Sequence, residues 1–236
     1  MTIRRISPVF LVFCAVFAQA QTHDFGFYPD TLRGEAWIDL DPVYGDRVDI
    51  ESPLTPEISG RRVLQETALY FSGMIYGWSF HYHIGERARG IAEDFSVFEP
   101  MGEIVWGDPR MRITEVENRD MQLRLWADYH MDEAQQRRIH LWRTGTSRNA
   151  QAMGYVSIFG SSPDDGWFEI RNALIKDAAR AAVREMLRGT ERNRPKEASG
   201  FISLASFPRF FMDSGQWAAE VRFRVQINEI IPFAVH

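Results

Sequence analysis

Apolar residues recur every three or four positions between residues 57 and 75 and again between residues 86 and 98. Because this is the period of one helix face, both ranges are predicted to be helices, the second ended by Pro100. A third helix is predicted after Ser162-Pro163-Asp164-Asp165, since a capping serine, a proline and two acids suit a helix N-terminus. Its apolar stripe is rich in alanine and reaches Gly189, so this helix can pack closely against a sheet.

Alternation of apolar and polar residues predicts strands in most of the remaining chain. Residues 78–84 place aromatic rings on one face of a strand and two histidines on the other. The longest alternation runs from 217 to 227, after Asp213-Ser214-Gly215-Gln216, which predicts a hairpin turn. Further strands are expected over 35–41, 103–106, 110–117, 121–130, 137–143, 153–159, 200–207 and 209–213.

Short connections between these strands favour antiparallel pairing, because a parallel crossover needs a long connection. The sequence therefore predicts an α+β fold: a mainly antiparallel sheet, with a meander and a C-terminal hairpin, packed by two or three helices. Residues 21–56 are expected to be an irregular lead-in that holds one strand. Residues 57–236 are expected to form a single domain, with two small subdomains that meet near residue 160 as the alternative.

Residues 1–20 have the layout of a secretory signal peptide, with two arginines, an uncharged apolar run and a small-residue site at Ala18-Gln19-Ala20. The run is shorter than the about 20 residues that span a bilayer as a helix. Phe13 precedes Cys14, where lipid attachment favours a small residue, so cleavage is expected instead of lipidation. We expect a mature chain that begins at Gln21, lies in the periplasm or outside the cell, and has no transmembrane segment.

The composition narrows the classes of function. The chain has 27 basic and 32 acidic residues, a formal net charge of −5, and one cysteine. That cysteine, Cys14, lies in the signal peptide, so the mature chain is expected to have neither disulfides nor cysteine catalysis. The acidic balance and the scattered arginines argue against nucleic-acid binding. The 13% of aromatic residues supply bulky core side chains and contact surface.

His81 and His83 are the sharpest chemical candidates. Residues two apart on a strand point to the same face, so the two imidazoles can approach one metal ion. Glu86, His130 and His140 are the alternatives for a third ligand. The spacing matches none of the longer zinc signatures, and no cofactor is expected. A secreted hydrolase or metal-dependent enzyme that uses these residues and nearby carboxylates is one alternative function.

Trp78, Phe210, Phe211 and Trp217 are the candidate interaction residues. Phe210 and Phe211 are adjacent in a predicted strand, so one of their rings must point away from the core. No nucleophile elbow, phosphate loop or dinucleotide fingerprint is present. We therefore expect an exported, noncatalytic cell-envelope protein that binds another envelope protein; a carrier of a small apolar ligand is a further alternative. The oligomeric state is left open.

Overall fold

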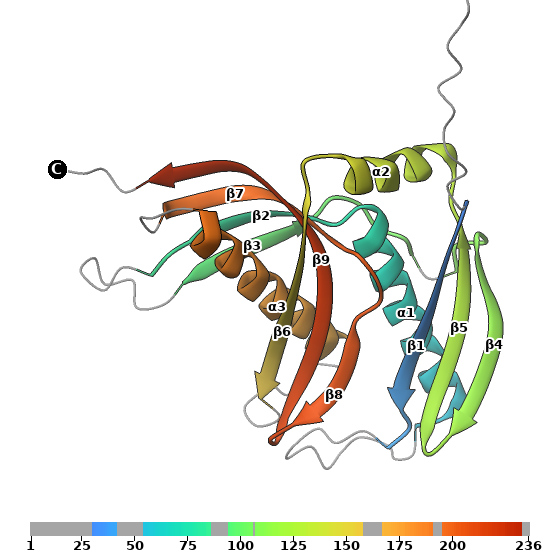
Figure 1. Ribbon diagram of the computed structural model, residues 1–236. Coiled ribbons are helices and arrows are strands. Elements are labelled where there is room, and N and C mark those ends of the chain that lie inside the picture. Colours follow the sequence, from blue (N-terminus) through green and yellow to red (C-terminus); the bar gives the residue numbers. More distant parts are fainter. Residues whose placement is uncertain are drawn as a thin grey trace, which may run out of the picture.

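Two antiparallel sheets and three helices make up the described part of the chain (Figure 1). The structure is a computed structural model that describes residues 30–41, 54–85, 94–105, 107–157, 167–190 and 195–232. The signal peptide predicted at 1–20, Glu86 and the capping run predicted at 162–165 lie outside the described residues. The α+β class predicted from the sequence is confirmed.

The two sheets differ in size. The smaller sheet has the order β1-β5-β4, and its strands are β1 (Thr31–Asp39), β4 (Met111–Arg119) and β5 (Gln122–His130). The larger sheet has the order β3-β2-β7-β9-β6, and β8 pairs with β9 beside this path. Its strands are β2 (Trp78–His83), β3 (Phe95–Pro100), β6 (Arg148–Ser157), β7 (Pro195–Leu204), β8 (Arg209–Asp213) and β9 (Gln216–Pro232).

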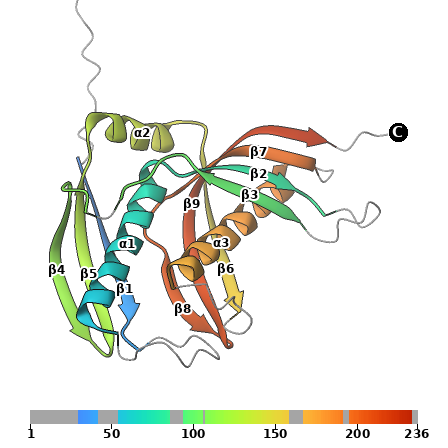
Figure 2. The same cartoon turned by 180° about the vertical axis from the view of Figure 1, so that it is seen from behind.

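Helices α1 (Pro56–Ile75) and α3 (Trp167–Thr190) pack against the sheets, and α2 (Glu133–Thr144) packs against α1. Helix α1 lies between the two sheets and contacts β1, β5 and β7 (Figures 1 and 2). Helix α3 packs on β6 and β9. Helix α2 meets the C-terminal end of α1, where Trp142 Nε1 donates to the carbonyl oxygen of Ile75 at 3.1 Å. None of the described helices is long and apolar enough to cross a membrane.

One face of the larger sheet forms the main core. Trp78, Ile202 and Val225 are neighbours across β2, β7 and β9, and all three side chains are buried. Phe71 of α1 and Leu174 of α3 are also fully buried in this core. Burial of these apolar faces is the main favourable contribution to folding, at roughly 25 cal/mol per Å². The opposite face of β2, which carries the two histidines, is partly exposed.

Several local predictions agree closely with the structure. The helix predicted over 57–75 is α1, and the alternation over 217–227 lies within β9. The predicted turn at 213–216 joins β8 and β9, and both of its central residues, Ser214 (φ 49°) and Gly215 (φ 77°), have positive φ. Two positive φ values match the twist of an antiparallel hairpin.

The strand predicted over 137–143 is wrong, because these residues belong to α2. The helix begins with a capping box in which Asp132 accepts from Gln135 N–H and the Gln135 side chain accepts from Asp132 N–H. This box satisfies two backbone donors at the helix start. Ile139 and Trp142, three residues apart, are then buried on one helical face. The capping box was visible in the sequence and outweighs the short apolar alternation.

The helix predicted over 86–98 is also wrong over residues 95–98, which belong to strand β3. Residues 86–93 lie outside the described residues. Pairing with β2 places Phe98 opposite Phe80, and this tertiary contact overrides the helical spacing. Residues 103–105 form no strand, and β6 begins earlier than predicted and joins the larger sheet beside β9. Strand β1 begins at Thr31, so part of the expected lead-in is a full sheet member.

A polar network ties the start of α2 to the smaller sheet. Arg110 donates through NH2 to Asp108 at 3.0 Å and through NH1 to Asp132 at 2.7 Å. Tyr129 also donates to Asp108, at 3.1 Å, and Gln135 donates to Tyr129 at 3.1 Å. Hydrogen bonds from Arg110 lower the pKa of Asp108. The pKa of Asp132 is lowered mainly by the hydrogen bond from the Gln135 backbone N–H, and to a smaller extent by the hydrogen bond from Arg110.

This network predicts acid sensitivity. A carboxyl whose folded-state pKa is depressed adds stability above its unfolded pKa of about 3.9, and that stability is lost as the pH falls through the folded value. The urea midpoint of the protein is therefore expected to fall between about pH 5 and about pH 3. In Asp108→Asn this fall is expected to be smaller. Asp120→Asn, which changes an exposed carboxylate, is the control, and an equal fall in Asp108→Asn and the wild type contradicts the assignment.

Candidate functional site

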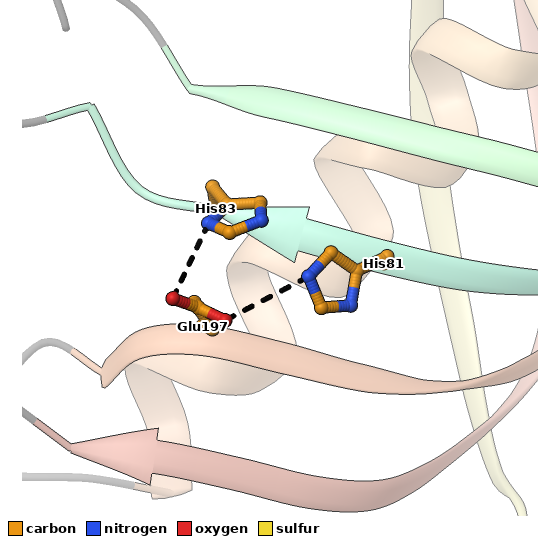
Figure 3. Close-up of side chains that lie close together, drawn as sticks. All are labelled: His81, His83 and Glu197. Carbon is orange, nitrogen blue, oxygen red and sulfur yellow. Dashed lines mark ion pairs between the residues drawn. The ribbon is translucent and has the colours of Figure 1, made fainter.

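His81 and His83 lie side by side on the exposed face of β2 (Figure 3). Their ring centroids are 4.5 Å apart and the rings are tilted by 70°. The buried residues between and beside them, Phe80 and Tyr82, hold the strand against the core. The expectation that both imidazoles share one face is confirmed.

Glu197 of β7 completes this cluster. It is the cross-strand neighbour of His83, and its carboxylate reaches both rings. Oε2 lies 3.8 Å from His81 Nε2 and Oε1 lies 3.8 Å from His83 Nδ1. One ligand atom from each of the three residues lies within 4.8 Å of the others. The arrangement can hold a divalent cation or can act as an ion pair shared by two imidazoles.

The structure brings together some of the histidines and acids considered from the sequence but not others. Glu86 lies outside the described residues, and Glu197 takes the position of the third group. His130 is in the smaller sheet, with Nδ1 3.1 Å from Thr31 Oγ1. Sequence reasoning missed Glu197 because it lies far along the chain, before the strand predicted over 200–207. Only the antiparallel pairing of β2 with β7 brings it to the histidines.

An aromatic groove runs between the two sheets. Its volume is about 710 Å³. The groove-lining residues combine rings and a methionine with a few charged and polar groups: Glu35, Trp37, Asp39, Gln122, Arg124, Ser206, Phe207, Pro208, Arg209, Phe210, Phe211, Met212 and Trp217.

Three of the four candidate interaction residues line this aromatic groove. Phe210 and Trp217 are largely buried, while Phe211 is 39% exposed. The expectation that one of the adjacent rings points away from the core is confirmed by this contrast. Trp78 is buried and instead lines a second cavity of about 450 Å³ between α1, α3 and residues 100–105.

The groove is bordered by two strand edges. Among the described strands, β1 pairs only with β5 and β8 pairs only with β9. Each strand is therefore at the edge of its part of the structure, and in both views β1 and β8 are neighbours (Figures 1 and 2). An edge strand presents backbone N–H and C=O groups that can pair with another extended chain.

Both arginines that line the groove form ion pairs within the protein. Arg124 NH1 lies 3.1 Å from Glu35 Oε1, and Arg209 NH1 lies 3.1 Å from Glu220 Oε2. Each arginine at the groove therefore already has a carboxylate partner within the chain.

The fold and these two sites define an α+β protein with two sheets, an aromatic groove between them and a histidine–carboxylate cluster on the larger sheet. The chain belongs to a protein family whose model matches residues 27–233 and for which no function is described. It is 27% identical to an uncharacterized protein of Treponema pallidum (strain Nichols), in an alignment that covers 97% of this chain and 95% of the relative. No solved structure matches the chain.

Proposed function

We propose that this protein is an exported, noncatalytic component of the cell envelope that binds an extended segment of another envelope protein in the aromatic groove. The observation that carries the proposal is the position of the groove between two strand edges, β1 and β8. Export rests on the signal peptide predicted at residues 1–20.

Strand addition explains why the occupant is an extended segment. A chain laid along β8 gains main-chain hydrogen bonds over five residues, or about 17 Å at 3.4 Å per residue. Alternate side chains of such a segment then meet the rings of the groove, and these contacts supply specificity. Because both arginines at the groove already have carboxylate partners within the protein, an apolar or aromatic segment fits this surface better than an acidic one.

A carrier of a small apolar ligand is a second candidate, favoured by the cavity between α1 and α3. Its volume of about 450 Å³ falls within the range of small-molecule sites. Leu69, Ile104 and Phe168 line it together with Trp78. Ligand extraction from the purified protein, followed by mass spectrometry, tests this candidate separately from the groove.

Site-specific photo-crosslinking tests the proposed function. A photoreactive amino acid at Phe211 is expected to crosslink the protein, in cells that express it, to one defined envelope protein through an extended segment. The same amino acid at Leu141, which is 66% exposed on α2, is the matched control. A synthetic peptide with the crosslinked sequence is then expected to bind the purified protein, and Phe211→Asp is expected to weaken this binding at least about tenfold.

Two results contradict the proposal. One is a crosslinking pattern at Phe211 that does not differ from the pattern at Leu141. The other is a crosslinked peptide that binds the Phe211→Asp protein as tightly as it binds the wild type.

A further inference from the structure

We propose that His81, His83 and Glu197 bind one divalent transition-metal ion, with Zn²⁺ as the representative ion. The three side chains come from two neighbouring strands of the larger sheet and point toward one another on its exposed face (Figure 3). The site lies apart from the aromatic groove, since none of its residues lines that groove. It therefore adds a second ligand to the proposed function and does not depend on it.

The separations are close to those that a metal ion requires. Zinc bonds to nitrogen and oxygen are about 2.0–2.2 Å, so two ligand atoms in a tetrahedral site are about 3.4 Å apart. Each histidine nitrogen already lies 3.8 Å from a carboxylate oxygen of Glu197, and all three ligand atoms lie within 4.8 Å. No two of these ligand atoms need to approach each other by more than about 1.4 Å to reach that separation.

The backbone holds the ligands in place before the ion arrives. β2 and β7 are paired in antiparallel register, with His83 opposite Glu197 and Tyr82 opposite Ala198. Tyr82 and Ala198 are both buried, so the residues between the ligands anchor this part of the sheet to the core. A site on two paired strands loses less conformational entropy on metal binding than a site on loops does.

The donor set selects the class of metal. Two imidazoles and one carboxylate suit Zn²⁺, Cu²⁺, Ni²⁺ or Fe²⁺, whereas Mg²⁺ and Ca²⁺ prefer oxygen ligands only. The His81 side chain is 47% exposed and that of His83 is 33% exposed, while that of Glu197 is 18% exposed. The solvent side of the cluster is therefore open, and a water molecule can complete the coordination of the ion.

The pairing between imidazole and carboxylate is a weak alternative explanation of the cluster. An exposed ion pair contributes about 0–1 kcal/mol to stability, and a histidine takes part only when it is protonated. The two adjacent rings also repel each other if both carry a proton. A metal ion uses the neutral form of both imidazoles and the ionised form of the carboxylate, and so satisfies all three groups at once.

Isothermal titration calorimetry of the full protein without a histidine tag tests this proposal. Zinc chloride is expected to bind with one ion per chain at neutral pH, and an excess of Mg²⁺ is expected not to displace it. His81→Ala, His83→Ala and Glu197→Gln are each expected to weaken zinc binding at least about tenfold. Mutation of a group that only orients a metal ligand already weakens metal binding by about this factor, so loss of a ligand itself is expected to do no less. His130→Ala removes a histidine outside the cluster and is the matched control.

Circular dichroism and the thermal midpoint of each variant are the controls for folding. Both are expected to match the wild type, because the two histidines are partly exposed and lie outside the core. Zinc binding of equal strength in the wild type and in the His81→Ala, His83→Ala double variant overturns the proposal, as does a folded wild-type protein that binds no zinc. The Phe211→Asp protein is expected to bind zinc as the wild type does, so failure of the groove and failure of the metal site remain distinguishable.

Discussion

Replacement of Glu66 by alanine is expected to lower the free energy of unfolding by about 3–5 kcal/mol, because it removes a carboxylate partner from the buried guanidinium of Arg171. Glu66 in α1 and Arg171 in α3 are both almost fully buried, and Arg171 Nε lies 3.6 Å from Glu66 Oε2. Tyr70 also donates to Glu66, at 2.8 Å. The pair joins the two long helices at the centre of the protein.

Aromatic rings surround the guanidinium of Arg171. Its Cζ atom lies 3.8 Å from the ring centroid of Phe210 and 4.8 Å from that of Trp37. Its NH2 group donates to the carbonyl oxygen of Trp37 at 3.3 Å. Arg171 therefore connects α3 to β1 and β8, the two strands that border the aromatic groove, and loss of Glu66 is expected to disturb the groove as well.

Equilibrium urea unfolding measures this effect. Glu57→Ala is the matched control on the same helix, since the Glu57 side chain is 87% exposed and its ion pair with Arg61 spans 3.8 Å. That change is expected to alter stability by no more than about 0.5 kcal/mol. The double variant Glu66→Leu, Arg171→Met is expected to recover much of the loss, because no charge is then left buried. A loss below about 1 kcal/mol in Glu66→Ala contradicts the assigned role of the pair.

Replacement of Gly154 by alanine is expected to cost about 3 kcal/mol, at the upper end of the usual cost of overpacking. Gly154 lies in β6, where the strand meets α3. A Cβ atom there collides with the carbonyl oxygen of Leu174 and lies 2.7 Å from the backbone nitrogen of Ala178. Both contacts are with backbone atoms, so the helix itself must move away from the sheet.

Gly60→Ala is the control for this substitution. Gly60 lies within α1 and a Cβ atom there meets no atom within 4 Å. Alanine at this helical position is expected to stabilise the protein by up to about 1 kcal/mol. Urea unfolding of both variants is the measurement, and a Gly154→Ala protein as stable as the wild type contradicts the close packing of α3 on β6.

The contact between α3 and β6 was predictable from the local sequence pattern only in part. The alanine-rich stripe predicted that the third helix approaches a sheet closely, and Ala178 and Ala182 are indeed buried. The strand beneath it, however, was not predictable from the stripe. Its identity depends on the pairing of β6 with β9, which places Gly154 opposite Ala219. Such pairing joins segments that are distant in the sequence.

In the candidate sites, too, some features follow from local sequence patterns and others do not. The shared face of His81 and His83 follows from the two-residue period of a strand, and the exposed ring at Phe211 follows from its adjacency to Phe210. Glu197 and the groove have no comparable local signal. The groove combines β1, β5, β8 and β9, and the histidine–carboxylate cluster combines β2 and β7.

The sequence by itself determined the elements whose patterns are local: α1, the histidine-bearing strand β2, the β8–β9 hairpin and the α+β class. These follow from hydrophobic periodicity and from turn chemistry, which act over a few residues. Only the tertiary structure decided the division into two sheets, the edges that border the groove, the buried Glu66–Arg171 pair and the approach of Glu197 to the histidines. The physical reason is that strand pairing and helix packing are set by burial across the whole chain, which no short segment encodes.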